Sequence, residues 1–144
     1  MTPVRVLITG SRSWDLGPDF AERVVTGLLQ KHGPGLILIH GDCPSGVDAA
    51  IQEACEEVGV PTERHPADWQ ALGKGAGPRR NQAMVDLGAA LCLAFSRDLH
   101  ASRGTADCAR RARASGIPTW HVRSDTPGDV VLLNPSAAPK EAKP

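Results

Sequence analysis

Three short segments of the chain combine glycine with hydroxyl and arginine side chains, the residue types that bind phosphate groups. They are the segments 9–12 (TGSR), 41–46 (GDCPSG) and 102–105 (SRGT). Glycine lets the backbone come close to a phosphate and adopt a positive φ angle. Serine, threonine and arginine donate hydrogen bonds to phosphate oxygens, arginine through a bidentate fork. These segments therefore suggest anion binding.

The elements around these segments explain how they could meet in space. Apolar runs at 4–9, 36–40 and 90–95 each precede one of the segments, and a helix is predicted after each segment. The carboxyl ends of parallel strands share one edge of a sheet, where open α/β folds bind their ligands. Helix N-termini at that edge present free N–H groups and the positive end of the helix dipole. We therefore predict one phosphate-binding pocket.

The predicted pocket draws on all three segments and on a helix that starts near residue 79. Its predicted ligand-binding residues are Gly10, Ser11, Arg12, Gly41, Ser45, Gly46, Asp48, Arg79, Arg80, Asn81, Arg103, Gly104 and Thr105. Trp14 and Trp69, in predicted loops beside the pocket, are further candidates because an indole ring can stack on a nucleobase. For both residues the alternative is a position over the edge of the core, which is favoured for Trp14.

Two carboxylates are candidates for acid–base chemistry, and each has a simpler alternative role. Asp42 could act as a base, bind a ribose hydroxyl or cap the following helix. Asp107 lies in the first turn of its helix, where a carboxylate complements the helix dipole without any further role. His40, at the end of a strand, is interpreted as a satisfied polar group. No His, Cys or Asp cluster has metal-ligand spacing, so neither a metal nor a cofactor is predicted.

Strands alternate with helices along the chain. Strands are predicted at 4–9, 36–40, 61–65, 90–95 and 118–122, with helices starting near 18, 46, 79 and 105. This alternation predicts an α/β protein with a Rossmann-like three-layer α/β/α fold, a parallel sheet and strand order 3-2-1-4-5. Segment 66–78 shows no periodicity and is predicted to be a functional or mobile loop. The absence of GxGxxG and GxxxxGK[ST] argues against a dinucleotide dehydrogenase and a P-loop NTPase.

Length and composition limit the remaining possibilities. A chain of 144 residues fits one domain. We predict a nucleotide-ligand domain over 1–123, followed by a disordered Pro- and Ala-rich tail over 124–144. The sequence has no membrane-length apolar run and no recognisable signal peptide, which predicts a cytoplasmic protein without membrane association. Sixteen basic residues balance sixteen acidic ones, which argues against DNA as a partner.

The same segments, taken in order, resemble a known family. VRVLITGSRSW, LILIHGDCPSGVD, PADW, GKGAGPRRNQAM and RGTADCARRA are similar to the YspA-like branch of the SLOG superfamily. That superfamily also includes the LOG nucleoside-phosphate hydrolases and the DprA/Smf proteins. The resemblance spans residues 4–122. It implies a Rossmann-like fold that binds nucleotides or nucleotide-derived ligands, and it favours a homodimer.

Comparison with the LOG enzymes separates binding from catalysis. Those enzymes hydrolyse the N-glycosidic bond of a nucleoside monophosphate. Arg80, Gly104 and Thr105 match their motifs, and the resemblance implies phosphate or sugar contacts for these residues. At the position of the LOG catalytic glutamate this chain has Cys108, with Asp107 one residue earlier. The resemblance therefore implies ligand-binding roles for these residues, but this chain has no residue that corresponds to the LOG catalytic glutamate.

Three functions follow from these observations. The first is binding of a nucleotide or nucleotide-derived phosphorylated ligand, extended to N-glycosidic hydrolysis if Asp107 or Asp42 serves as the acid or base. The second is a non-catalytic ligand sensor in signalling or phage defence, which the missing glutamate favours. The third is DprA-like binding of single-stranded DNA, which the neutral charge and the few aromatic residues disfavour.

Overall fold

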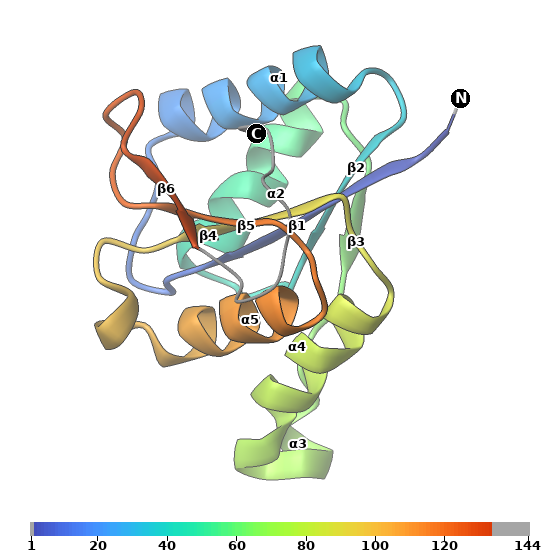
Figure 1. The fold of residues 1–144 in the computed structure, drawn as a ribbon, viewed down its shortest axis with the longest axis vertical. Helices are drawn as coiled ribbons and strands as arrows, with labels where there is room; N and C mark the ends of the chain where they lie inside the picture. The colour runs from blue at the N-terminus through green and yellow to red at the C-terminus, as the bar shows by residue number, and fades with distance from the viewer. Residues whose placement is uncertain (1, 134–144) are drawn as a thin grey trace.

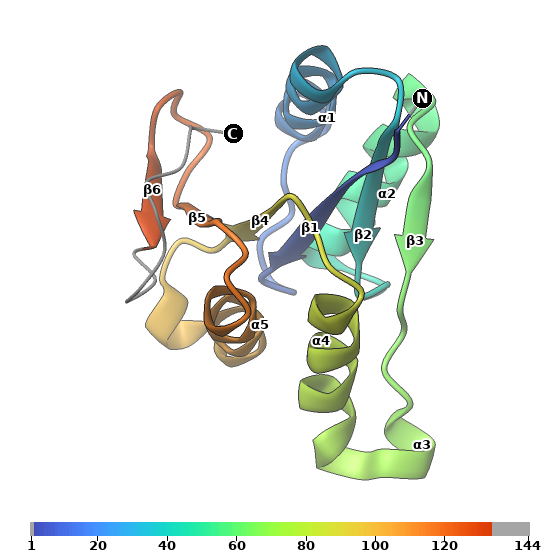
Figure 2. The same cartoon turned by 45° about the vertical axis from the view of Figure 1, so that its right-hand side comes forward.

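Six strands form one sheet, with helices on both of its faces (Figures 1 and 2). The structure is a computed structural model that describes residues 2–133. The strands are β1 (Val4–Gly10), β2 (Leu36–His40), β3 (Thr62–Arg64), β4 (Leu91–Phe95), β5 (Thr119–Val122) and β6 (Val130–Leu133). The helices are α1 (Pro18–His32), α2 (Gly46–Val58), α3 (Trp69–Leu72), α4 (Ala76–Asp86) and α5 (Arg103–Ala114), with short 3₁₀ turns at Gly73–Gly75 (η1) and Leu99–Ala101 (η2).

The strand order is β3-β2-β1-β4-β5-β6, and the first five strands of that order pair in parallel. This confirms the predicted Rossmann-like α/β class and the predicted order of five strands. The chain leaves β1 for β2 on one side and later returns to place β4 on the other. The neighbouring loops therefore diverge at the carboxyl ends of β1 and β4, where such sheets bind ligands. At this point the Ser11 N–H donates to the Phe95 carbonyl, with N and O 3.0 Å apart.

The core consists of two apolar layers, one on each face of the sheet. Val6 and Ile8 point to the layer covered by α1 and α2, whereas Leu7, between them, points to the layer covered by α4 and α5. This alternation is the period-2 side-chain pattern of a strand that is buried on both faces. Continuous apolar runs such as LILI and LCLAF are therefore required at the centre of this sheet.

The sheet extends past the boundary predicted at residue 123. β6 pairs antiparallel with β5, with Thr119 opposite Leu133 and Val122 opposite Val130. The disordered tail predicted from residue 124 is therefore wrong for 124–133. The run VVLL has the β-branched and apolar residues of a strand, and a turn closed by hydrogen bonds from Arg123 and Ser124 to Asp129 returns it to the sheet. The rest of the predicted tail, 134–144, lies outside the described residues.

Segment 66–78, predicted to be a loop, contains α3, η1 and the first turn of α4. The carboxylate of Asp68 caps α3 by accepting a hydrogen bond from the Ala71 N–H at 3.1 Å. The helix predicted near Arg79 starts three residues earlier, at Ala76. Segments this short give no readable period, because a helical pattern needs more than one turn to repeat. No helix within residues 2–133 has the length and apolar character needed to cross a bilayer.

Candidate functional site

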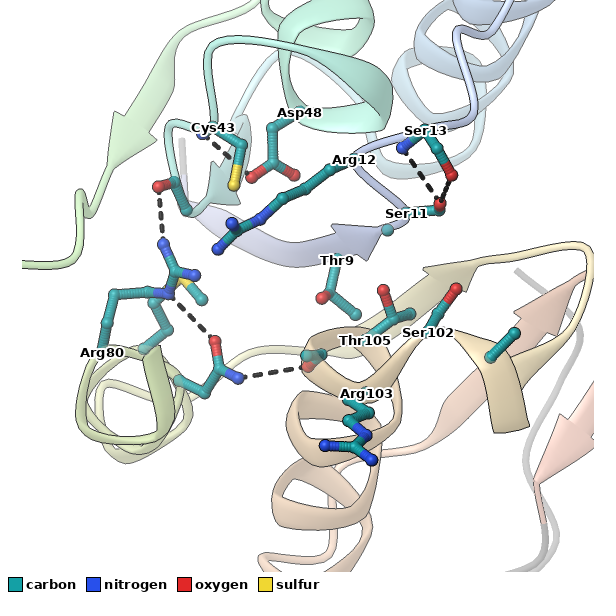
Figure 3. Close-up of a pocket in the computed structure, with 16 residues that line it drawn as sticks. Thr9, Ser11, Arg12, Ser13, Cys43, Asp48, Arg80, Ser102, Arg103 and Thr105 are labelled. Carbon is teal, nitrogen blue, oxygen red and sulfur yellow. Dashed lines mark hydrogen bonds between the residues drawn. The ribbon is translucent and has the colours of Figure 1, made fainter. Parts of the chain in front are cut away.

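The three glycine-containing segments meet around one cavity of about 280 Å³ at the carboxyl edge of the sheet (Figure 3). It lies between the ends of β1 and β2, the side of α4 that carries Arg80 and Met84, and the N-terminus of α5. The lining residues are Thr9, Gly10, Ser11, Arg12, Ser13, Gly41, Cys43, Asp48, Arg80, Asn81, Met84, Ala101, Ser102, Arg103, Gly104 and Thr105. The elements of the predicted pocket are therefore neighbours in space.

The N-terminus of α5 faces this cavity without a side-chain cap. Ser102, at the capping position, makes no side-chain hydrogen bond to the helix. Its hydroxyl oxygen instead accepts a hydrogen bond from the Ser96 hydroxyl, with the two Oγ atoms 2.9 Å apart. A Cβ atom built on Gly104 would meet nothing within 4 Å, so the backbone here is open to a ligand. The first N–H groups of a helix have no partner inside it, so this end of α5 can bind an anion.

Three arginines line the cavity, Arg12, Arg80 and Arg103, and the contacts of the first two differ. Arg12 is exposed, and its guanidinium lies over the Trp69 ring, 5.3 Å from the ring centroid. Arg80 is held by the backbone: its Nη1 donates to the Gly41 carbonyl at 2.6 Å and to the His65 carbonyl at 3.2 Å. Arg80 therefore holds two loops together while its charge remains at the cavity. Arg12 is exposed, and its side chain is free of such backbone bonds among the described contacts.

Asp48 places a buried carboxyl group in the cavity wall. Its residue is only 5% exposed. Oδ2 accepts a hydrogen bond from the Cys43 N–H at 3.3 Å, while Oδ1 is buried and has no hydrogen-bond partner among the described residues. Burial raises the pKa of Asp48, although the hydrogen bonds from Cys43 and the nearby Arg80 charge oppose this shift. Figure 3 shows the carboxyl group directed into the cavity between Cys43 and Arg12.

His40 has a structural role beside this group. The residue is fully buried. Its Nδ1 accepts a hydrogen bond from the Asp42 N–H at 3.0 Å, which leaves the proton on Nε2 to be donated to Gln52 Oε1 at 2.8 Å. Both ring nitrogens are therefore satisfied, and the ring supports the turn that follows β2. The interpretation of His40 as a satisfied polar group agrees with these contacts.

The two carboxylates predicted to be acid–base candidates both lie outside the cavity lining. Asp107 accepts hydrogen bonds from Asn81 at 3.0 Å and Arg111 at 2.9 Å and forms an ion pair with Arg110. Burial alone would raise the pKa of Asp107, but the contacts with Arg111, Asn81 and Arg110 outweigh it and lower the pKa. Asp42 adopts φ 57° and lies 3.9 Å from Arg64 in a neighbouring depression.

The remaining predicted residues occupy different places: the core, the rim of the cavity, the contacts between loops and the exposed surface. Trp14 is 7% exposed and packs against Phe20, so it belongs to the core, the alternative role considered for it. Trp69 is 48% exposed and lies beside the cavity. Ser45 donates to the Arg12 carbonyl at 3.2 Å, and Gly46, at φ 72°, approaches the Ser11 carbonyl too closely for a Cβ atom, so both hold adjoining loops together. Arg79 is exposed and lines none of the cavities described here.

Several lining residues were not among the predicted site residues. They are Thr9, Ser13, Cys43, Met84, Ala101 and Ser102. All except Met84 lie within or beside the glycine-containing segments, so their position in the chain was the available signal. Met84 is one helical turn after Arg80, a spacing that places both on the same side of α4. Within the described residues, no group of three or more His, Cys, Asp or Glu side chains could hold a metal ion.

The fold is that of a Rossmann-like domain with a cavity at the carboxyl edge of its sheet, and comparison with known proteins identifies the family. The model of the YspA, cpYpsA-related SLOG family matches residues 4–71. The Gene 61 protein of Mycobacterium phage D29 is 41% identical over 118 residues, covering 79% of this chain and 92% of the phage protein. The chain belongs to the YspA-like SLOG family, which confirms the resemblance identified from the motifs.

Proposed function

We propose that this protein binds a nucleotide or nucleotide-derived phosphorylated ligand in the cavity at the carboxyl edge of its sheet. The observation that carries the proposal is the uncapped N-terminus of α5, where Gly104 opens the backbone to the cavity. Family membership supports the same class of ligand. The ligand's phosphate would accept hydrogen bonds from the free N–H groups of this helix and from the hydroxyl of Thr105, with Arg12 supplying charge.

Asp48 supports a sugar phosphate over a bare phosphate. A carboxylate oxygen near an anion site is unfavourable unless the ligand also brings a hydrogen-bond donor. The unpartnered Oδ1 lies in the wall of the same cavity as Thr105 and Gly104. A ribose hydroxyl is such a donor, and it is linked covalently to the phosphate of a nucleotide. We therefore assign Asp48 to the sugar and the start of α5 to the phosphate.

A second candidate function, cleavage of an N-glycosidic bond, would depend on Asp48. Among the described residues it is the only carboxylate that lines the cavity. Glycoside cleavage needs a carboxyl group whose protonation suits transfer of a proton to or from the reacting group. The raised pKa of Asp48 favours that role, whereas the lowered pKa and the ion pairs of Asp107 oppose it.

Calorimetric titration with AMP, ribose 5-phosphate and inorganic phosphate tests the binding proposal. We expect AMP and ribose 5-phosphate to bind more tightly than phosphate, and binding to be lost in Gly104→Val. Chromatography of the titrated AMP then separates the two activities. Released adenine supports the glycosidase, and bound but intact AMP supports a sensor. If none of the three compounds binds, the proposed function is wrong.

A further inference from the structure

A second, larger hollow adjoins the cavity and is strongly basic. It has a volume of about 890 Å³ and lies across α4 and α5, between Trp69 and η2. We call it the α4–α5 groove. It shares Arg12, Arg80, Asn81, Arg103 and Gly104 with the first cavity. A ligand whose phosphate lies at the start of α5 can therefore extend into the groove past these shared residues.

The charge of the groove contrasts with that of the whole chain. Its basic lining residues are Arg12, Lys74, Arg80, Arg103, Arg110 and Arg113. Asp107 is the only carboxylate among its described lining residues, and it is already paired with Arg110 and Arg111. The full sequence has equal numbers of acidic and basic residues. The positive charge is therefore concentrated locally, which favours a ligand with more negative charge than one phosphate.

We infer that the α4–α5 groove binds a second phosphate group, so that the ligand is a diphosphate of the nucleoside diphosphate type. This inference rests on the proposed function. The first phosphate would use the N–H groups at the start of α5, and the second would be contacted by Lys74 and Arg110. Arg103 lines both hollows, so it could contact either phosphate. Cationic side chains are the usual partners of phosphate oxygens, through charge-assisted hydrogen bonds.

A strand of nucleic acid fits the groove less well than a small diphosphate. Proteins that bind single strands offer several aromatic side chains on which successive bases stack. In this groove Trp69 is the one aromatic residue among the described lining residues, and it already carries the Arg12 guanidinium over its ring. A single platform of this kind can accommodate one base.

Calorimetry with AMP and ADP on the full-length protein tests the inference. We expect ADP to bind about tenfold more tightly than AMP, the factor that corresponds to one additional charge-assisted contact of ordinary strength. In Lys74→Ala/Arg110→Ala the affinity for ADP should fall to that for AMP, while the affinity for AMP stays unchanged. Arg79→Ala is the matched control, because Arg79 is an exposed arginine of α4 outside the groove, and it should retain the preference for ADP.

The outcomes distinguish this inference from the proposed function. Equal affinities for AMP and ADP in the wild-type protein would overturn the second phosphate site and leave the first intact. Failure of both nucleotides to bind would overturn both proposals. Tighter binding of an oligothymidine than of ADP, with a steep dependence on salt, would replace the small diphosphate by nucleic acid. Circular dichroism of the double variant checks its folding, and Lys74→Gln/Arg110→Gln provides a second, bulkier replacement.

Discussion

The side-chain amide of Asn81 donates a hydrogen bond to the carboxylate of Asp107, with Nδ2 and Oδ2 3.0 Å apart. The same amide nitrogen lies 3.2 Å from the Gly104 carbonyl oxygen. One residue of α4 thus holds both the first carboxylate of α5 and the backbone beside the cavity. Asp107 therefore links α4 to α5, and its carboxylate is already engaged by Asn81, Arg110 and Arg111.

Asp107→Asn should lower stability in a pH-dependent way. Burial opposes ionisation of this carboxyl, but hydrogen bonds from Arg111 and Asn81 prevail and lower its pKa in the folded protein. Such a carboxylate adds stability above its unfolded pKa, and this contribution is lost as the pH falls through the folded pKa. We expect urea unfolding to show a loss of about 1 kcal/mol at pH 7 that disappears in strong acid. A loss that stays constant down to acid pH would contradict the ion-pair assignment.

Asp48 should give the stability of the wild-type protein a pH dependence opposite to that given by Asp107, and Asp48→Asn should remove it. Burial raises the pKa of Asp48, so the folded protein holds its proton to higher pH than the unfolded chain does. Stability should therefore fall as the pH rises from the unfolded pKa through the folded one, and then level off. The asparagine variant should lack this decline. Its affinity for ribose 5-phosphate should fall about tenfold, with the affinity for inorganic phosphate unchanged; equal losses for both ligands would remove Asp48 from the sugar site.

Gly104→Val and Gly10→Ala should separate binding from folding. A Cβ atom at Gly104 meets open space, so valine there should leave the melting temperature nearly unchanged and weaken AMP binding at least about tenfold by occupying the phosphate position. A Cβ atom at Gly10 would lie 2.5 Å from Cβ of Val47. Even alanine at that position should cost about 1–3 kcal/mol of stability. Thermal melts and calorimetry on the two variants check this contrast.

Arg12→Ala and Arg80→Ala should both weaken AMP binding, but only the second should destabilise the fold. Arg80 donates to the carbonyl groups of Gly41 and His65, and its removal leaves those acceptors unpaired. Such a loss costs about 1–3 kcal/mol. Arg12 is exposed, so its removal should change the midpoint of urea unfolding only slightly. Equal unfolding midpoints for the two variants would mean that Arg80 does not brace the loops.

Much of the fold could be predicted because its signals are local and repeated. Buried parallel strands require continuous apolar runs, and the glycines after them marked the edge at which the site lies. β6 was missed because four residues provide a weak pattern beside a segment rich in proline and alanine. β6 is stabilised by its pairing with β5, and the composition of the segment alone does not predict this tertiary contact.

The site could be located from the sequence, but the direction of each side chain could not. Arg79 and Arg80 are adjacent on α4, so they point about 100° apart, and only Arg80 reaches the cavity. The predicted start of this helix is three residues late, so the prediction could not say which side of the helix each arginine occupies. Trp14 and Trp69 both lie next to irregular segments, so the sequence does not distinguish them. Tertiary packing buries Trp14 in the core and leaves Trp69 half exposed. Arg110 and Arg111 lie three and four residues after Asp107 in the same helix, a spacing that the sequence shows, whereas its partner Asn81 comes from α4 and leaves no trace in local spacing.

The ends of the sheet limit how two copies of this chain could associate. β3 has three residues and β6 has four, and these two strands occupy the outer positions. Long, flat outer strands are the templates on which chains add to one another by backbone pairing. Because both border strands are short within the described residues, a continuous sheet across two molecules would gain few hydrogen bonds, so the helix faces are the surfaces on which to test the expected homodimer.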